Sequence, residues 1–245
     1  MSVLLQAQAL LLPSFATEDG FDIALEPGQR WLLTGESGSG KSTLMRTLLG
    51  LVSPRGGDVL LHGTSLQDVT PAELLRLRQS MSVVFSGGGL LPAWNGLQNL
   101  MLPLRAIRGL TEHAAQDAVL AFASRCQIPT QWLERAATQL TAEQGTLLAL
   151  ARALITTPRL LWIDSELVWG VLSHANTRLG AELAAQVAQG CTLVVAAGPH
   201  GVIREQVPPC DGPTHRAHLQ DGWLECLAPP TDWTLDTADA QTPRA

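Results

Sequence analysis

The stretch Gly35-Glu36-Ser37-Gly38-Ser39-Gly40-Lys41-Ser42-Thr43 decides the fold class of this 245-residue chain. It matches the pattern G-x-x-x-x-G-K-[ST], in which backbone N–H groups of a glycine-rich loop curl around the phosphates of a nucleoside triphosphate. We expect Lys41 to reach the β- and γ-phosphates, Ser42 to offer its hydroxyl to Mg²⁺, and Thr43 to contact the α-phosphate. The stretch therefore predicts ATP and Mg²⁺ as cofactors.

The residues around this stretch supply the strand and the helix that the motif requires. Arg30–Leu33 has the pattern of a short apolar strand, and Lys41–Leu49 has helical periodicity. Further along, Leu160–Ile163 predicts a buried strand that ends at Asp164, whose carboxylate would hold the magnesium shell together with Ser42. Two alternatives stay open: an accidental glycine-rich turn for the loop, and a simple turn cap for Asp164.

Strand and helix patterns alternate along the chain, which predicts an α/β fold with a mostly parallel sheet. Two strands separated by a polar turn near Glu18 predict an antiparallel β flank at the N-terminal end. Helical periodicity between the two parts of the sheet predicts an inserted helical subdomain. The expected strands are Val3–Leu12, Phe21–Leu25, Arg30–Leu33, Val59–Leu61, Met81–Phe85, Leu160–Ile163 and Thr192–Ala196, and the expected helices are Lys41–Leu49, Pro71–Arg78, Leu97–Ile107, Glu112–Ser124, Ala142–Ile155 and Ala175–Val187.

These patterns also predict how the chain is organised. We expect one domain over residues 1–227, with the helical insertion at residues 87–140 inside it. Residues 228–245 are rich in Pro, Thr, Asp and Ala and show no periodicity, so we expect a disordered tail there.

Composition narrows the classes of partner. The formal net charge of −6 gives no broad attraction for nucleic acid, so we expect no nucleic-acid partner. The four cysteines contain no C-x-x-C pair, so neither a zinc site nor a redox motif is predicted. The apolar start of the chain lacks a basic leading segment and is too short to span a bilayer, so we expect no direct membrane insertion. A cytoplasmic protein is the resulting prediction.

Three stretches of the sequence carry a resemblance to the ATP-binding subunits of ABC transporters. They are GESGSGKST at Gly35–Thr43, LTAEQGTLLALARAL at Leu140–Leu154, and Thr192–Ala197, where the family has a strand that leads to a switch histidine. The second stretch is similar to the family's signature, LSGGQ-x-x-x-x-x-LARAL. The resemblance covers about residues 3–226 and implies a P-loop NTPase (RecA-like) fold.

The resemblance also implies partners and a location. In that family two domains pair head to tail, and each ATP lies between the phosphate loop of one chain and the signature of the other. We therefore expect a second ABC domain, in a homo- or heterodimer, and an integral-membrane permease subunit. The protein would be cytoplasmic and peripheral to the inner membrane through that permease.

The catalytic positions of the family are altered in this sequence. Ser86 stands at the Q-loop glutamine, and Ser165 stands at the glutamate that activates the attacking water. Serine is no general base at neutral pH. Glu166 and His200 are the remaining candidates for the missing glutamate and the missing switch histidine, with a solvated surface glutamate and an ordinary loop histidine as the alternatives. We expect ATP binding with weak or absent hydrolysis.

The signature itself also differs from the family pattern. Ala142 and Glu143 occupy the places of two glycines whose backbone N–H groups approach the partner's γ-phosphate. Either Cβ obstructs that approach, and the carboxylate of Glu143 repels a phosphate. Thr141 and Gln144 match a capping box, so a helix start is predicted even where the phosphate contact is lost. The D-loop stretch Val168–Val171 reads VWGV and lacks the family's acidic residue.

The sequence also offers candidate residues for contact with adenine and with a permease. The family stacks adenine on an aromatic residue near the first strand; the equivalent region is Leu10–Leu12, with Phe15 slightly later. A groove for the permease would use exposed apolar residues, with a place in the core of the insertion as the alternative. The residues concerned are Leu90, Leu91, Trp94 and Leu97.

Two functions remain open from the sequence. The first is the ATP-binding subunit of an ABC transporter complex. The second is a catalytically inactive ABC paralogue that serves as a regulatory or structural subunit. A cassette protein acting on ribosomes or DNA would need a basic face or a second cassette, and the sequence predicts neither.

Overall fold

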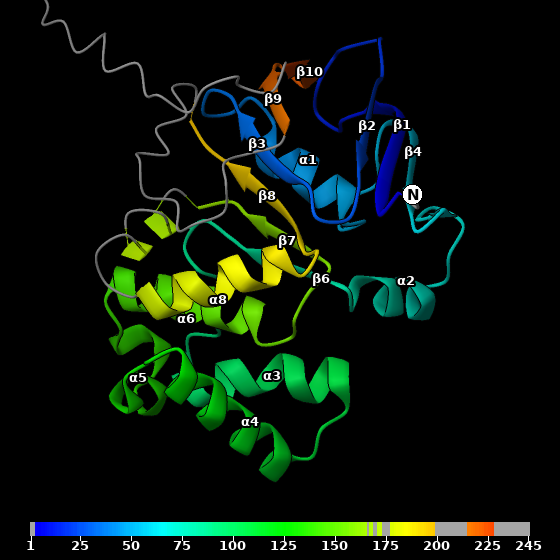
Figure 1. Cartoon of the computed structure of the whole chain (residues 1–245). Coiled ribbons are helices and arrows are strands. Elements are labelled where there is room, and N and C mark those ends of the chain that lie inside the picture. The colour runs from blue at the N-terminus through cyan, green and yellow to red at the C-terminus, as the bar shows by residue number, and fades with distance from the viewer. Residues whose placement is uncertain (1–2, 166, 169–170, 173–176, 199–214, 228–245) are drawn as a thin grey trace, which may run out of the picture.

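A six-stranded sheet forms the centre of the molecule (Figure 1). In the computed structural model, residues 3–165, 167–168, 171–172, 177–198 and 215–227 are described. The strands of this sheet are β3 (Arg30–Thr34), β6 (Met81–Val84), β7 (Leu160–Ile163), β8 (Thr192–Ala196), β9 (His215–Gln220) and β10 (Trp223–Leu227). Their order is β10-β9-β3-β8-β7-β6, and all neighbouring pairs are parallel except β9 with β10.

A second sheet, of four strands from the N-terminal part of the chain, flanks the first. It contains β1 (Leu5–Leu11), β2 (Phe21–Leu25), β4 (Gly56–Leu61) and β5 (Thr64–Ser65), in the order β2-β1-β4-β5. All its pairs are antiparallel. A bulge interrupts β1 at Ala9, whose backbone N–H donates to the carboxylate of Asp22 at 2.6 Å. The predicted antiparallel flank is thus confirmed.

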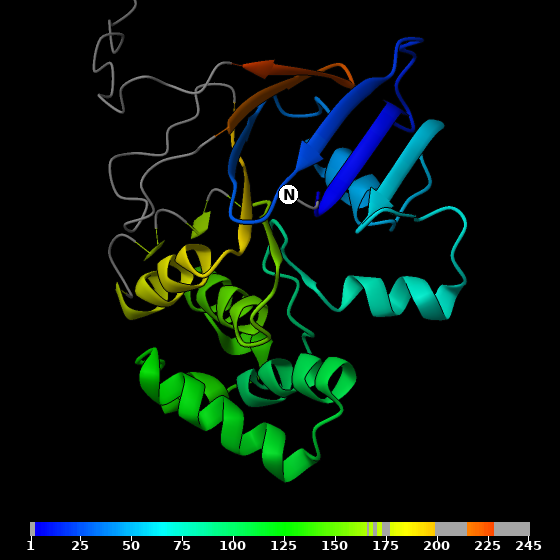
Figure 2. The ribbon, with the colours of Figure 1, turned by 45° about the vertical axis from the view of Figure 1, so that its right-hand side comes forward.

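Helix α1 (Lys41–Leu48) packs between the two sheets (Figures 1 and 2). Its apolar face is formed by Leu44, Met45 and Leu48, which are fully buried together with residues of both sheets. Arg46 lies on the opposite face and is exposed. The amphipathic pattern of this helix therefore fixes the phosphate-binding stretch, which lies just before it, against the core.

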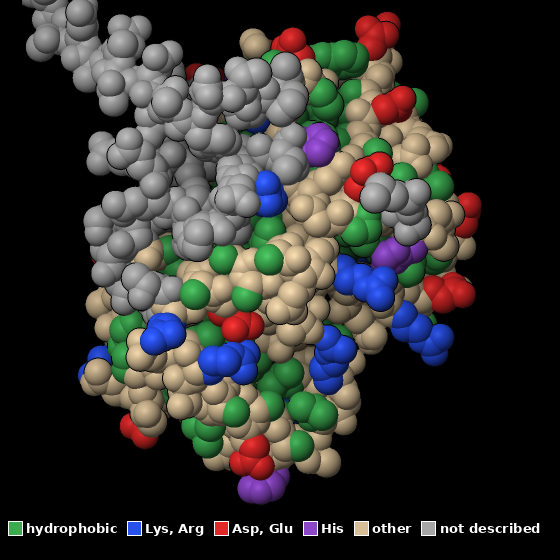
Figure 3. Space-filling model, viewed as in Figure 1, with side chains coloured by type: hydrophobic (Ala, Val, Ile, Leu, Met, Phe, Trp, Pro, Cys, Tyr) green, Lys and Arg blue, Asp and Glu red, His purple; other side chains and the backbone are tan. Residues whose placement is uncertain are grey.

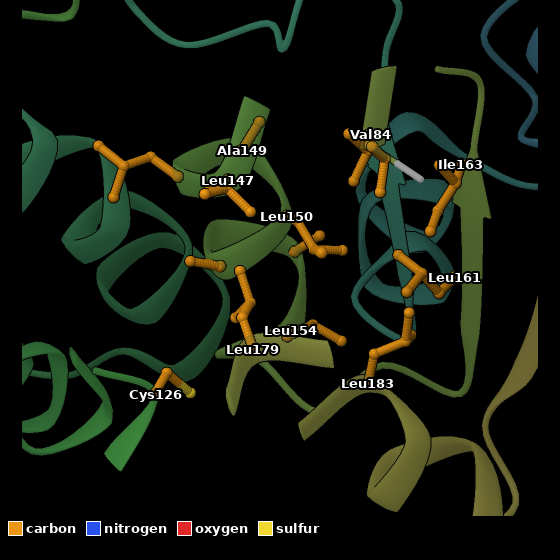
Figure 4. Packing of buried hydrophobic residues seen from close by; sticks show 14 of the residues in the cluster. Val84, Cys126, Leu147, Ala149, Leu150, Leu154, Leu161, Ile163, Leu179 and Leu183 are labelled. Carbon is orange, nitrogen blue, oxygen red and sulfur yellow. The ribbon is translucent and has the colours of Figure 1, made fainter. Parts of the chain in front are cut away.

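Helices cover the other face of the six-stranded sheet. Helices α6 (Ala142–Leu154) and α8 (Thr177–Ala188) lie next to that face. Figure 4 shows Leu150 of α6 pointing toward Val84 of β6 and Leu161 of β7, all three of which are fully buried. Helices α3 (Gly96–Arg108), α4 (Glu112–Arg125) and α5 (Thr130–Glu134) form the layer beyond α6, and α2 (Pro71–Arg78) lies to one side in both ribbon views (Figures 1 and 2).

The predicted α/β architecture is confirmed, and two details differ. Strands β9 and β10 form an additional hairpin that the sequence patterns did not predict. Of the predicted exposed apolar group, Leu91 and Trp94 are exposed to 39% and 38%, whereas Leu90 and Leu97 pack partly buried against the core below the sheet. The start of the helix expected from residue 175 and the predicted tail at 228–245 lie outside the described residues.

Candidate nucleotide site

The phosphate loop joins β3 to α1, as the motif predicts. Gly35 has φ 156°, and a Cβ at this position would lie 2.3 Å from the carbonyl oxygen of Leu219 in β9. Glycine is therefore required here for space, because a neighbouring strand reaches the loop backbone. Gly40 caps α1 with φ 108°, and its carbonyl accepts from the Leu44 N–H at 2.7 Å. The helix N-terminus thus faces the loop with its partial positive charge.

Lys41 lies across the loop. Its Nζ donates to the carbonyl oxygens of Gly35 at 2.6 Å and Glu36 at 2.8 Å. Lys41 is also the single lysine of the chain, since the other cationic side chains are all arginines. The ammonium group is therefore held against the loop backbone, and Lys41 lines the pocket over the loop.

Ser42 and Asp164 meet although they are far apart in sequence. The Ser42 hydroxyl at the start of α1 donates to Oδ2 of Asp164, just past the end of β7, at 2.7 Å. A hydroxyl and a carboxylate are hard oxygen ligands of the kind that Mg²⁺ takes beside a nucleotide phosphate. The two residues that the sequence assigned to the metal therefore lie close enough to share one ion, and the donor set fits magnesium.

An open pocket of about 800 Å³ lies over the phosphate loop and brings the predicted residues together. It is lined by most of the loop, by Ser86 and Gly87 after β6, by Asp164, Ser165 and Leu167 after β7, and by Ala196, Ala197 and Gly198 after β8. These segments all follow the carboxyl ends of parallel strands, which is where ligands bind in such sheets. Ser165 is among the lining residues although only 7% of it is exposed.

At the positions where the family has residues that activate water, the described pocket wall has short or apolar side chains. Ser86 and Ser165 carry hydroxyls, and Ala196 and Ala197 present only methyl groups where the switch histidine was expected. Glu166 and His200, the two remaining candidates, lie outside the described residues. Within the D-loop stretch, Val168 and Val171 are described and buried.

Helix α6 begins with the capping box predicted from the sequence. The Thr141 hydroxyl accepts from the Gln144 N–H at 3.2 Å, and the Gln144 side chain accepts from the Thr141 N–H at 3.1 Å. Ala142 and Glu143 are exposed in the first turn. The start of the helix is thus stable while it presents a carboxylate to solvent.

Sequence reasoning missed the hairpin turn that supports the loop from behind, and it named Phe15 only as a residue that could stack on adenine. The hairpin turn of β9 and β10 touches the loop, because the Gly222 N–H donates to the Ser39 carbonyl at 3.2 Å. The ring of Phe15 lies between Gly40 and Gly222, so a Cβ on either glycine would come within 3 Å of it. The turn signal Asp221-Gly222 was present in the sequence, but only the parallel pairing of β9 with β3 brings it to the loop.

The family model described as ABC transporter matches residues 19–167. The lipoprotein-releasing system ATP-binding protein LolD of Hydrogenovibrio crunogenus is 36% identical over 146 residues, which cover 59% of this chain and 63% of LolD. The methionine import ATP-binding protein MetN of Latilactobacillus sakei is 30% identical over 195 residues, which cover 78% of this chain and 55% of MetN. The chain thus spans less than two thirds of the length of either relative.

Solved structures share the fold. A dimeric ATP-binding cassette in a post-hydrolysis state with ADP and Pi matches with a TM-score of 0.75 at 22% identity, covering 92% of this chain and 99% of that chain. No helix in the described part of this chain is long and apolar enough to cross a membrane. Because the family model spans more than half of the sequence, the chain belongs to the ABC transporter family, as one of its nucleotide-binding domains.

Proposed function

We propose that this chain captures Mg-ATP as the ATP-binding subunit of a membrane transporter and hydrolyses it weakly or not at all. One observation carries the proposal: the pocket combines a complete phosphate loop and the Ser42–Asp164 pair with serines at positions 86 and 165. Residues 35–43 would bind the phosphates, and Ser42 with Asp164 would hold Mg²⁺, which neutralises phosphate charge when bound.

Weak hydrolysis follows from the chemistry of the pocket wall. The hydroxyl of Ser165 does not titrate near pH 7 and cannot take a proton from water efficiently. Ser86 is short, so it would reach the metal at most through a bridging water. The methyl groups of Ala196 and Ala197 supply no hydrogen-bond donor to a transferring phosphoryl group.

The surface at the start of α6 bears on the choice of partner cassette. Glu143 places a carboxylate where the family presents a phosphate-binding backbone, so a second copy of this chain would meet each ATP with negative charge. A homodimer would then have two defective sites, and a partner with its own catalytic glutamate would still face this altered signature.

We propose residues 1–227 as the cassette and 87–140 as its helical insertion.

The surface charge agrees with a protein partner rather than a nucleic acid. On the described part of the face in Figure 3, the Lys and Arg side chains lie in several groups spread across the face, with Asp and Glu side chains on the same face. The formal net charge of the chain is −6. Non-specific nucleic-acid binding depends on clustered cations, which that face does not present in its described part.

Phe15 is the proposed contact for the base of the nucleotide. Leu10 and Leu12 are fully buried and do not meet a ligand, whereas Phe15 is half-buried beside Gly40 at the start of α1. Phe15→Ala is expected to weaken ATP binding about tenfold, because a stacked base contributes about 1–3 kcal/mol. Inorganic triphosphate, which has no base, should bind the variant and the wild type equally. Equal losses for both ligands in a calorimetric titration would show that Phe15 acts only by supporting the loop.

Permease docking is proposed for the loop before α3. Leu91 and Trp94 are exposed there, and buried Asn99 holds the loop from inside. Oδ1 of Asn99 accepts from the Leu91 N–H at 2.7 Å, and Nδ2 lies within hydrogen-bond distance of the carbonyls of Leu91, Trp94 and Asn95. The exposed apolar pair is therefore presented on a fixed loop.

Asn99→Ala is expected to lower the free energy of unfolding by about 2 kcal/mol, because it removes the acceptor of the Leu91 N–H and the hydrogen bonds from a buried amide to three loop carbonyls. Urea unfolding measures this change, and limited proteolysis should show new cleavage between residues 91 and 95. Asn95→Ala, which removes a more exposed helix cap, is the matched control with an expected loss of about 1 kcal/mol. If the Asn99 variant were as stable as the Asn95 variant, the proposal that Asn99 fixes the loop before α3 would be contradicted.

ATP turnover of the copurified complex, measured with and without replacement of Lys41, separates the two proposed roles. A transporter subunit should copurify with a membrane protein and support ATP turnover in the complex. A regulatory or structural subunit should copurify as well, bind Mg-ATP, and leave turnover of the complex unchanged when Lys41 is replaced.

A further inference from the structure

Three consecutive glycines form the turn that follows β6. Gly87, Gly88 and Gly89 have φ values of 90°, 79° and 63°, all in the left-handed region. Ser86 and Gly87 line the nucleotide pocket, and Gly87 also lines a second pocket of about 310 Å³ at the start of α6. Three such residues in a row have wide conformational freedom, so the position of this pocket wall must be set by contacts elsewhere.

Arg152 of α6 makes those contacts. Its Nη1 donates to the carbonyl oxygen of Gly89 at 2.8 Å, and its Nη2 donates to that of Gly88 at 3.3 Å. Burial lowers the pKa of the Arg152 guanidinium, and no carboxylate among the described residues forms a salt bridge with it. The partly buried charge is therefore compensated by backbone carbonyls of the turn.

The turn also packs directly on α6. A Cβ on Gly88 would lie 3.5 Å from both the Ala149 side chain and the Gly145 carbonyl, so the turn touches the first half of the helix. Gly145 and Ala149 are the small residues that permit this approach. The turn thus contacts the nucleotide pocket on one side and α6 on the other.

We infer that Arg152 is a positioning residue for the nucleotide pocket, which ties the Ser86–Gly89 turn to α6 so that the pocket wall and the start of α6 move together. This inference rests on the proposed binding of Mg-ATP in that pocket. The Ser86 side chain is too short to reach across the pocket and fix the wall from the front. The placement of the wall therefore depends on the hydrogen bonds that Arg152 donates to the Gly88 and Gly89 carbonyls. ATP in the pocket would consequently alter the exposed first turn of α6, at Ala142 and Glu143.

Hydrogen exchange of the full chain, with and without Mg-ATP, tests the inference. In the wild type, ATP should slow exchange in the phosphate loop, in residues 87–91 and in the first turn of α6. In Arg152→Met, which keeps the aliphatic stem, exchange of residues 87–91 without nucleotide should be about tenfold faster, since two hydrogen bonds from a charged donor are lost. Mg-ATP binding should weaken about tenfold, with protection remaining in the phosphate loop and lost in α6.

Two variants control for effects on folding. Arg152→Lys keeps a charged donor and should restore part of the protection in residues 87–91 and in α6. Arg108→Met removes another arginine that donates to backbone, namely to the Thr156 carbonyl, and it should leave nucleotide-dependent protection as in the wild type.

The possible failures are distinguishable. If the wild type binds Mg-ATP and Arg152→Met shows the same protection at residues 87–91 and in α6, the inference is overturned while the proposed function stands. If Arg152→Lys and Arg108→Met both behave like Arg152→Met, the effect is general loosening and the inference is overturned as well. If the wild type binds no nucleotide, the proposed function fails and the inference fails with it.

Discussion

Lys41→Ala is expected to weaken Mg-ATP binding about a hundredfold, the largest loss among the substitutions considered. The ammonium group of Lys41 lies over the loop, within 3 Å of the Gly35 and Glu36 carbonyls, and would transfer its donors to the β- and γ-phosphates. Hydrogen bonds to a charged group contribute about 1.5–3 kcal/mol each. A titration with a fluorescent ATP analogue measures the change.

Arg46→Ala is the matched control for this substitution. Arg46 belongs to the same helix as Lys41 but is exposed on the face away from the core. Its removal should leave ATP binding within about twofold, because exposed charges interact weakly through water. Equal weakening by both variants would show that the loop does not bind the phosphates through Lys41.

The single lysine offers an independent readout of the same prediction. Acetylation with an amine-reactive reagent should modify Lys41 as the one side-chain amine, and mass spectrometry separates it from the chain terminus. Mg-ATP should protect Lys41 from the reagent. Unchanged modification at saturating Mg-ATP would contradict the placement of the phosphates.

Ser165→Glu is expected to raise ATP turnover about a hundredfold over the wild type, the low end of what a positioned general base contributes. Position 165 is a buried position in the pocket lining directly after Asp164, and burial there would raise the pKa of a glutamate and make it a better base. Release of phosphate under saturating Mg-ATP measures the gain.

Ser165→Gln is the control for shape without basicity. Glutamine has the size of glutamate but cannot accept a proton, so its turnover should equal that of the wild type. A gain that is the same in both variants would mean that side-chain length, not proton transfer, limits the reaction. Wild-type turnover already equal to that of Ser165→Glu would contradict the proposed defect.

The parts of the fold with strong periodicity followed from the sequence. The strand before Gly35, the helix from Lys41 and the buried strand before Asp164 have clear local patterns, and the structure agrees within a residue or two. The hairpin of β9 and β10 did not follow, because His215–Gln220 alternates buried Ala217 and Leu219 with histidines and arginine and has little apolar character. Its pairing with β3 is a long-range event that local pattern does not encode.

The candidate site divides in the same way. The phosphate and metal residues were predictable because the motif fixes their roles over a short stretch, and Asp164 because it ends an apolar strand. Leu219, Gly222 and Arg152 were not predictable. Each of them contacts the site through tertiary packing. Arg152 lies near the end of α6, whereas the residues of that helix that resemble the family's signature lie at its start.

The proposed function is the capture of Mg-ATP without vigorous hydrolysis. Its most direct test is to mix purified protein in excess with Mg-ATP and to quantify ATP and ADP on the protein over time. Bound nucleotide is expected to remain ATP, with turnover at least a hundredfold below the ~10 s⁻¹ median of enzymes. Conversion to ADP at a rate near that median, abolished by Lys41→Ala, would contradict it.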